Sequence, residues 1–356
     1  MITIRSALDS DRAQVLTRIR EVFGDVPAVE AERLWQWQWH QDPRLPRPGY
    51  HAVVADWDGT IIGNLALIPA GLYLDGRPVN AHWCVSALVH WGLARQALRA
   101  AKRAGQETGL AGRGIAEALF GSPAAGDVQL AKHIARTMRA VLGRIGFEEV
   151  ANSGSLHRRV SLQRRLARVI GAVPASLVAP LANLALPRLP RARLSDDVAV
   201  MDGPFDRRFD EFWARLRDRF PAVTLRDRAT LQWRYRQHPL FDYKVLMLSD
   251  GDVLRGYLIY SQFERDNRQR GKLVDLFADP ADDEALRALV AAALRAMKRG
   301  EVERVEAFAS TDYLNRVLKG AGFIPRLTKA GEMQPMMVRG VSCASLHVGQ
   351  GDGDGG

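Results

Sequence analysis

One seven-residue pattern occurs twice in this chain, and this repeat restricts the fold more than any single motif does. The first copy, WQWHQDP, runs from Trp37 to Pro43, and the second, WRYRQHP, runs from Trp233 to Pro239. Both copies fit W-x-[W/Y]-x-Q-x-P without a gap, 196 residues apart. A platform for stacking a ligand need not occur twice, whereas an element of a duplicated domain would. The repeat therefore predicts two copies of one fold, and 356 residues suit two domains of ordinary size.

The elements expected after the two motifs follow the same order. Each half has a strand pair (51–70 and 243–262) that turns at an Asp-Gly step, at 58–59 and 250–251, which is a strong hairpin signal. The next elements are a strand (81–90 and 271–280), a helix (92–105 and 283–300), a short strand (116–122 and 302–310) and a last helix that ends in L-x-x-x-G-F at Phe147 and Phe323. This order predicts an α/β protein with one mixed sheet in each half.

The domain borders follow from the repeat and from composition. We expect a first domain over residues 1–155, a linker over 156–197, a second domain over 198–340 and a tail over 341–356. The tail ends in GQGDGDGG, and so much glycine predicts a flexible end.

Cysteine usage and the start of the chain bear on location. The two cysteines, Cys84 and Cys343, lie far apart and show no metal-ligand spacing, which suits a reducing compartment. The start carries charges where a signal peptide needs an apolar stretch, so we expect a cytoplasmic protein. Metal and nucleotide-hydrolysis motifs are missing from the sequence, and no metal is expected.

The net charge of +10 is concentrated in the linker. Residues 157–194 contain eight arginines and no acidic residue, so this segment carries eight of the ten net charges. A protein that follows a phosphate backbone usually spreads its basic residues over a folded face, and no DNA partner is expected. Residues 169–187 are uncharged, but prolines at 174, 180 and 187 argue against a membrane span. One interpretation is a set of apolar turns packed over the first domain. The other is a basic, apolar surface that touches the inner face of a membrane without crossing it.

With these elements in this order, the chain resembles the GNAT N-acyltransferase family twice, over about residues 1–155 and 198–330. It is most similar to the tandem GNAT proteins of bacteria, some of which are shaped like the FemAB and FemX aminoacyl transferases. The resemblance implies two GNAT-like units. It places the aromatic repeat at the end of the second helix of each unit, with the tryptophans packed on the sheet and the proline starting the next strand.

The resemblance also implies a reaction. An acyl group, expected to be acetyl, would pass from acetyl-CoA or another acyl-CoA to the amine of a small molecule or peptide, with the first half holding the cofactor. One alternative is a FemX-like transferase that uses aminoacyl-tRNA. Another is a GNAT-fold binding protein without catalysis, because two features of the family are altered in this chain.

The first altered feature is the loop for the cofactor. The family typically binds the pyrophosphate of acyl-CoA through backbone N–H groups of an R/Q-x-x-G-x-G/A loop, which opens the helix after the fourth strand. Here the chain runs directly from SALVH into WGLARQAL, which leaves Gly92 at the helix start. A literal match occurs later, and with its flanks it offers Gln106, Gly109, Ala111, Gly112 and Arg113. If a helix follows Gly114, this later loop is the cofactor loop. If a strand follows, this later loop is an insertion at the wrong end of the helix expected over 92–105, which connects two strands of the sheet.

The second altered feature is the catalytic acid. The family often uses a tyrosine five residues before the phenylalanine of G-F, but these positions are Leu142 and Leu318. Acyl transfer to an amine still needs a base for the amine and an acid for the thiolate. The remaining candidates are His82, Ser86, His90 and Glu117 in the first half, and Asp275 and Tyr313 in the second. Asp275 is the most unusual of them, because a carboxylate inside the apolar stretch LVDLF needs a partner or a raised pKa.

Overall fold

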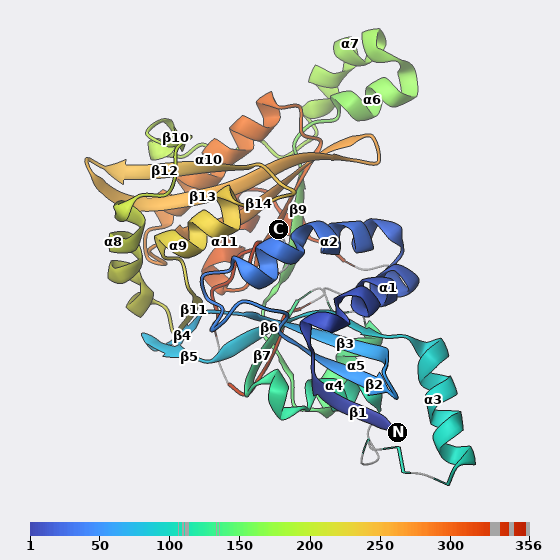
Figure 1. The fold of residues 1–356 in the computed structure, drawn as a ribbon. Helices are drawn as coiled ribbons and strands as arrows, with labels where there is room; N and C mark the ends of the chain where they lie inside the picture. The colour runs from blue at the N-terminus through green and yellow to red at the C-terminus, as the bar shows by residue number, and fades with distance from the viewer. Residues whose placement is uncertain are drawn as a thin grey trace.

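The computed structural model describes residues 1–105, 107, 108, 110, 114–132, 134, 136–327, 335–341 and 345–353. Two mixed sheets of seven strands dominate this part of the chain, and a sheet of three strands lies between the halves. Figure 1 shows the first sheet in the lower half of the molecule and the second sheet above it. The predicted α/β class, with one mixed sheet in each half, is confirmed.

The first sheet has the strand order β1-β2-β3-β6-β7-β17-β8. Its strands from the first half are β1 (Ile2–Ser6), β2 (Ala52–Trp57), β3 (Thr60–Pro69), β6 (Ala81–Val89), β7 (Val128–Ala131) and β8 (Glu148–Glu149). The helices are α1 (Arg12–Phe23), α2 (Asp25–His40), α3 (Trp91–Arg103), α4 (Ile115–Phe120) and α5 (Arg136–Arg144). Side chains alternate along β3, so Ala66 and Ile68 pack with α1 and α2, whereas Leu65 and Leu67 pack with α3, α4 and α5.

The second sheet has the order β10-β12-β13-β14-β15-β9-β16. Its strands are β9 (Gly154–Arg159), β10 (Ala199–Met201), β12 (Tyr243–Asp250), β13 (Val253–Arg265), β14 (Arg268–Ala278), β15 (Arg304–Ala309) and β16 (Ile324–Pro325). Its helices are α8 (Arg207–Leu216), α9 (Arg228–Leu231), α10 (Asp283–Arg299) and α11 (Asp312–Gly320), with a π-helical turn (Gln232–Arg236) after α9. Strands β14 and β15 run parallel, as β6 and β7 do in the first half.

Two details of the predicted order differ from the structure. The stretch 116–122 was expected to be a strand, but it belongs to helix α4, and the fifth strand is β7. A short apolar run fits a buried helix as well as a strand, and periodicity does not separate them. The second hairpin turns one residue later than expected, since β12 ends at Asp250 and β13 starts at Val253.

Each half completes the sheet of the other half. Strand β9 follows the first half in sequence but pairs antiparallel with β15 of the second sheet. Strand β17 (Met337–Arg339) follows the second half and pairs antiparallel with β7 of the first sheet. The third sheet also joins the halves, because β11 (Ala222–Thr224) pairs with β4 (Leu72–Leu74), which pairs with β5 (Arg77–Val79). The border expected at residue 155 therefore falls inside a strand of the second sheet.

The repeated aromatic motif lies where the halves meet. Trp37 and Trp233 are buried and stack face to face, with ring centroids 4.3 Å apart and planes 9° apart. Each indole N–H donates to the backbone carbonyl of the other tryptophan at 3.0 Å. The expectation that all the tryptophans pack on their own sheet is therefore wrong for this pair. The expectation that proline starts the next strand is also wrong, because β2 begins at Ala52 and β12 at Tyr243.

The glycine-rich end of the chain is packed between the halves. Leu346, His347, Val348 and Asp352 are all at most 1% exposed. The prediction of a flexible tail is therefore wrong for residues 345–353. Glycine serves close packing here, because a Cβ on Gly349 would lie 2.7 Å from the Val274 carbonyl oxygen.

The basic linker forms a helical hairpin, α6 (Gln163–Ile170) and α7 (Ala172–Asn183), which projects beyond the second sheet in Figure 1. Arg164 pairs with Glu301, and Arg168 pairs with Glu303. The expectation that this segment packs over the first domain is therefore wrong, because both carboxylates belong to the second half. Within the ranges that the structure describes, no helix is both long and apolar enough to cross a membrane.

Candidate active site

The central strand of the first half carries a bulge. Between the pairs Asn64–Leu88 and Ala66–Val85, two residues of β6 oppose one residue of β3. Ser86 lies in this bulge with a φ of 47°, a conformation that a residue other than glycine rarely adopts. The side-chain amide of the fully buried Asn64 donates to the Ser86 carbonyl at 3.1 Å, and the Tyr50 hydroxyl donates to Asn64 at 2.7 Å. Buried hydrogen bonds therefore hold the bulge in place, and bulges of this kind are frequent beside active sites.

Strand β6 is open on one side next to this bulge. Its parallel ladder with β7 covers only Ala81 to Trp83, although β6 continues to Val89. Among the described residues, no strand pairs with residues 84–89 on that side. Ser86 is exposed although it lies in the middle of a central strand. The first half therefore presents exposed, bulged backbone at the point where two parallel strands part.

The second half has the same arrangement, but the chain itself occupies it. The ladder of β14 with β15 ends at Leu273, and the β13–β14 pairing shifts register at Val274. The Gly351 N–H donates to the Val274 carbonyl at 3.0 Å, and the Val348 N–H donates to the Ser310 hydroxyl at 3.0 Å. Residues 348–351 thus lie between the parting strands of the second half.

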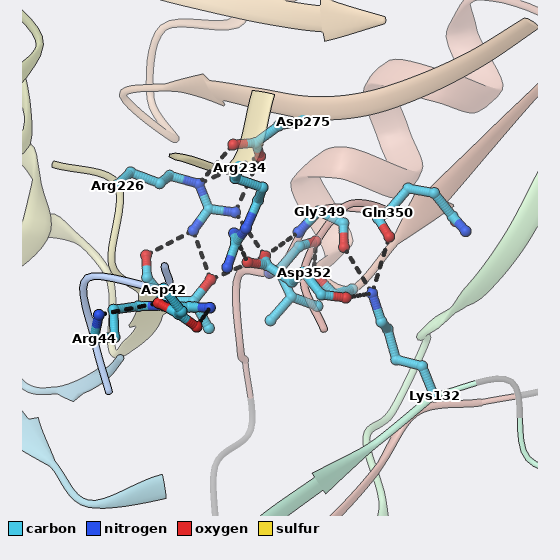
Figure 2. A network of polar contacts seen from close by, with 12 residues as sticks. Asp42, Arg44, Lys132, Arg226, Arg234, Asp275, Gly349, Gln350 and Asp352 are labelled. Carbon is cyan, nitrogen blue, oxygen red and sulfur yellow. Dashed lines mark hydrogen bonds and ion pairs between the residues drawn. The ribbon is translucent and has the colours of Figure 1, made fainter. Parts of the chain in front are cut away.

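A buried network of ion pairs fixes this tail, as Figure 2 shows. The Arg226 guanidinium lies between Asp275 and Asp352 and donates to each at 3.0 Å. Asp352 also accepts from Arg234, from the Thr224 hydroxyl and from the Gly349 N–H. Lys132, which follows β7 of the first half, donates to the carbonyls of Gly349 and Gln350 at 3.2 and 3.0 Å. The network joins both halves to the tail.

Asp275, the most unusual of the predicted residues, is part of this network. Burial raises the pKa of its carboxyl, and the adjacent Arg226 guanidinium opposes that effect. The carboxylate accepts from two nitrogens of Arg226 and from the Tyr257 hydroxyl, so its oxygens are engaged by neighbouring side chains. Burial also raises the pKa of Asp352, but Arg226 and Arg234 outweigh it and hold that pKa well below its usual range. These contacts suit a clamp on the tail better than a base that is open to substrate.

Tyr313 lies beside the same tail. It starts helix α11, and its hydroxyl contacts the Nδ1 atom of His347. Burial raises the pKa of Tyr313 and lowers that of His347, so both side chains are held neutral. The tail therefore lies beside both Tyr313 and Asp275.

The two histidines predicted on the fourth strand lie at its opposite ends. His82 lines a cavity of about 330 Å³ with Asp9, Arg47 and His51, and burial lowers the pKa of His82. His90 caps helix α3, because its Nδ1 atom accepts from the Leu93 N–H at 3.1 Å. Eight residues of strand separate the two by roughly 26 Å, so they do not share one site.

Glu117 is placed on a different element from the one expected. It lies in the first turn of α4 rather than at the start of a strand, and it pairs with Arg144 at 2.8 Å. On β6 itself, Cys84 near the bulge is partly buried, and desolvation raises the pKa of its thiol and keeps it protonated. The predicted residues therefore divide between the tail network, the two ends and the bulge of β6, and helix α4.

The two candidate cofactor loops differ in how far they are described. Gln106, Gly109, Ala111, Gly112 and Arg113 lie outside the described residues. Helix α4 directly follows Gly114, and a helix at this point is what we expect if the later loop is the cofactor loop. Gly92 lies in the first turn of α3, where a Cβ would come within 3.1 Å of the His90 ring.

Sequence reasoning missed Arg226, Arg234, Asp352 and Lys132 altogether. Asp352 sits in a glycine-rich end that resembles a disordered tail, and Arg234 occupies a variable position of the second aromatic motif. Arg226 and Lys132 lie in no recognisable motif. Within the described ranges, no group of three or more histidine, cysteine or acidic residues could hold a metal ion.

Comparisons with known proteins agree with this architecture. No protein-family profile matches the chain, and no curated protein sequence is significantly similar to it. Solved structures are similar in fold. A GCN5-related N-acetyltransferase from Anabaena variabilis superposes with a TM-score of 0.58 at 13% identity, over 95% of this chain and 72% of that one. N-myristoyltransferase from Saccharomyces cerevisiae, with bound myristoyl-CoA, gives 0.57 at 12% identity, over 97% and 84%.

These similarities define the class of fold. A GCN5-related N-acetyltransferase from Kribbella flavida also matches, with a TM-score of 0.55 at 13% identity, over 95% of this chain and 70% of that one. The fold is therefore that of the GNAT superfamily, in two GNAT-like units that together cover most of the chain. Identities this low establish the fold alone.

Proposed function

We propose that this protein is an acyl-CoA-dependent N-acyltransferase whose first half binds the acyl-CoA. The fold is shared with GCN5-related N-acetyltransferases and with an N-myristoyltransferase whose structure contains myristoyl-CoA. In our proposal the second half holds the tail and shapes the site for the amine, and acetyl is the expected acyl group.

One observation carries the assignment to the first half. Ser86 is exposed in a bulge of the central strand β6, beyond the last residue that pairs with β7. The pantetheine arm of acyl-CoA is an extended chain with amide groups, so it can pair with strand backbone in the way that residues 348–351 do beside β14. In the second half that place is taken by the chain itself.

The bulge also suits the chemistry of the transfer. The amine nitrogen attacks the thioester carbon, the C–N bond forms, the C–S bond breaks, and the amine proton passes to a base. The carbonyl oxygen carries negative charge in between, and backbone N–H groups that are not used in a ladder stabilise such a charge. In this proposal the Ser86 hydroxyl donates a hydrogen bond to the leaving thiolate sulfur, which then takes up the proton that the base received from the amine.

A substitution at Ser86 tests the site. Asparagine tolerates a positive φ, so Ser86→Asn keeps the bulge and adds bulk to the opening. We expect acetyl-CoA and myristoyl-CoA to bind the variant about tenfold more weakly by calorimetry, with the unfolding temperature unchanged. Asp266→Asn is the matched control, because Asp266 is exposed with a φ of 54° in the β13–β14 turn. Equal affinity of Ser86→Asn and wild type would place the cofactor elsewhere.

A second pair of variants separates the two candidate loops. Gly109→Val blocks the approach of a pyrophosphate if the later loop holds it, whereas Gly92→Val does so if the start of α3 holds it. Calorimetry on both variants decides between the loops. Wild-type protein that ignores acyl-CoA but is stabilised against heat by aminoacyl-tRNA would favour the FemX-like alternative. Stabilisation by neither ligand would favour a binding protein without this activity.

A further inference from the structure

The hairpin of α6 and α7 carries an apolar ridge that no other part of the described chain covers. Val173, Leu177, Leu181 and Leu184 follow each other at intervals of four, four and three residues, so they share one face of α7 and its C-terminal end. Their exposed fractions are 74%, 74%, 71% and 79%, and that of Val169 on α6 is 77%. The opposite face of α7 is buried through Ala175 and Ala179. A soluble surface rarely exposes so many large aliphatic side chains together, and such a patch usually marks an interaction site.

A basic cavity lies directly beside this ridge. Its volume is about 450 Å³, and six arginines line it: Arg159, Arg165, Arg168, Arg268, Arg270 and Arg304. Glu303 is the one carboxylate in the lining, and Arg168 already binds it through both oxygens. Val169, which is also exposed, lines this cavity from α6, so the cavity adjoins the hairpin that carries the ridge.

Carboxylates reach three of the remaining five arginines only at longer range, since Glu303 acts on Arg268 and Arg270 and Glu306 acts on Arg304. In the described part of the chain, none of Arg159, Arg165, Arg268, Arg270 and Arg304 forms an ion pair. Burial lowers the pKa of Arg304, and repulsion from Arg270 and Arg159 lowers it further. Guanidinium groups bind phosphate oxygens in pairs, so a phosphate group in this cavity would relieve the repulsion.

We propose that the α6–α7 hairpin docks on an anionic phospholipid membrane. The ridge enters the region between headgroups and acyl chains, and a headgroup phosphate occupies the arginine cavity. The aliphatic side chains fit the boundary with the acyl chains, and the clustered arginines fit the layer of headgroup phosphates. A nucleic acid would satisfy the arginines but would leave the leucines exposed, because single strands are bound by stacking on aromatic rings. The inference does not depend on the proposed acyl transfer.

The sequence suggested a basic surface over residues 157–194, and the structure refines which residues can form it. Arg158 is 2% exposed and donates to the carbonyls of Pro187 and Arg188, so it stabilises the fold rather than meeting a membrane. Arg164 is paired with Glu301. Arg165 and Arg270 are therefore the arginines to change in a test.

The test is sedimentation with vesicles. Wild-type protein should pellet with vesicles of phosphatidylcholine and phosphatidylglycerol, should pellet weakly with phosphatidylcholine alone, and should be released by high salt. Leu177→Ser with Leu181→Ser should weaken binding about a hundredfold, or about tenfold for each buried leucine. Arg165→Gln with Arg270→Gln should weaken binding to the anionic vesicles by about tenfold or more.

Matched variants on other surfaces serve as controls. Val26 and Val29 of α2 are 68% and 49% exposed, so Val26→Ser with Val29→Ser changes two apolar residues of another helix. Arg207→Gln with Arg287→Gln removes two exposed arginines elsewhere. Neither pair should alter pelleting. Equal pelleting of the leucine variant and wild type, or no pelleting of wild type with anionic vesicles, would overturn the proposal. Binding of RNA that survives the leucine changes, without vesicle binding, would assign the cavity to nucleic acid instead.

Discussion

Trp37 and Trp233 form a reciprocal pair, in which each indole N–H donates to the backbone carbonyl of the other tryptophan at 3.0 Å while the rings stack at 4.3 Å. The repeated motif therefore also provides a direct contact between the two halves. Both residues are buried, and they come from the same place in the two copies of one motif. The pair behaves as a small symmetric interface inside one chain.

Breaking this pair should destabilise the whole protein. Trp37→Phe keeps an aromatic ring but leaves the Trp233 carbonyl without its donor, which should cost about 1–3 kcal/mol of unfolding free energy. Trp37→Ala should cost about 3–5 kcal/mol, because it also empties a buried site. Urea unfolding measures both losses. Trp91→Phe, at a position 66% exposed, is the control and should change stability by less than about 0.5 kcal/mol. Additive effects of Trp37→Phe and Trp233→Phe would argue against a coupled pair.

Asp352 should hold the tail and, through it, both halves. Asp352→Asn removes the charge that neutralises Arg226 and Arg234, and breaking a buried ion pair in this way should cost about 3–5 kcal/mol. The pKa of Asp352 is lowered in the folded protein. Its carboxylate therefore contributes fully to the free energy of unfolding above the ordinary pKa of an aspartate, near pH 4, and this contribution is lost only as the pH falls through the lowered value. The unfolding free energy that Asp352→Asn loses should therefore be at its full value at pH 7. The exposed Asp58→Asn is the control, and equal stability of the two variants would contradict the clamp.

His238 should make stability depend on pH in mild acid. Burial, with a smaller contribution from the nearby Lys272, lowers its pKa to about 4. Its Nδ1 atom accepts from the N–H groups of Leu240 and Phe241, which favours the neutral ring. Between pH 6.5 and 4 the unfolded chain binds a proton that the native protein does not, so the unfolding free energy should fall by about 1.4 kcal/mol per pH unit as the pH drops.

The variant His238→Asn cannot take up this proton, so its stability should fall less steeply over the same range. Denaturant unfolding at several pH values gives the two slopes, and His40→Asn is the control for the same exchange near the end of α2. Parallel slopes for wild type and His238→Asn would contradict the assignment.

Much of the fold could be predicted because it depends on local patterns. The Asp58–Gly59 turn is one such pattern, since both residues have positive φ and the sequence shows the step directly. The exchange of β9 and β17 between the sheets could not be predicted. Both strands are short, and each pairs with a strand that is distant in the sequence. Strand β9 pairs with β15, and β17 pairs with β7. Pairing at that distance leaves no periodic signal.

The candidate site was less predictable for a different physical reason. Composition cannot distinguish a glycine that gives flexibility from a glycine that allows close packing, and residues 345–353 belong to the second kind. A Cβ on Gly351 would lie 2.7 Å from a methyl carbon of Val274. The bulge at Ser86 likewise depends on hydrogen bonds from Asn64 and Tyr50, which come together only in the folded sheet.

The packing of the tail gives a prediction of its own. Gly351→Ala should cost about 1–3 kcal/mol of unfolding free energy, because the added methyl group forces the tail away from β14. Gly143→Ala is the matched control, since a Cβ at this position in α5 meets nothing within 4 Å. That change should stabilise the protein by about 0.5–1 kcal/mol through helix propensity. A neutral Gly351→Ala would show that the tail is not packed as described.

Binding of acyl-CoA beside β6 of the first half, as proposed above, can be tested by hydrogen–deuterium exchange with and without acetyl-CoA. Within the described ranges no strand pairs with residues 84–92 on the β7 side, so bound pantetheine should slow the exchange of the amides that face this side. Amides of β14 and of residues 345–353 should be unchanged, because the tail already fills the equivalent place in the second half. Protection confined to residues 84–92 and the neighbouring loops is the expected result. Unchanged exchange over residues 84–92, or protection centred on β14 and the tail, would contradict it.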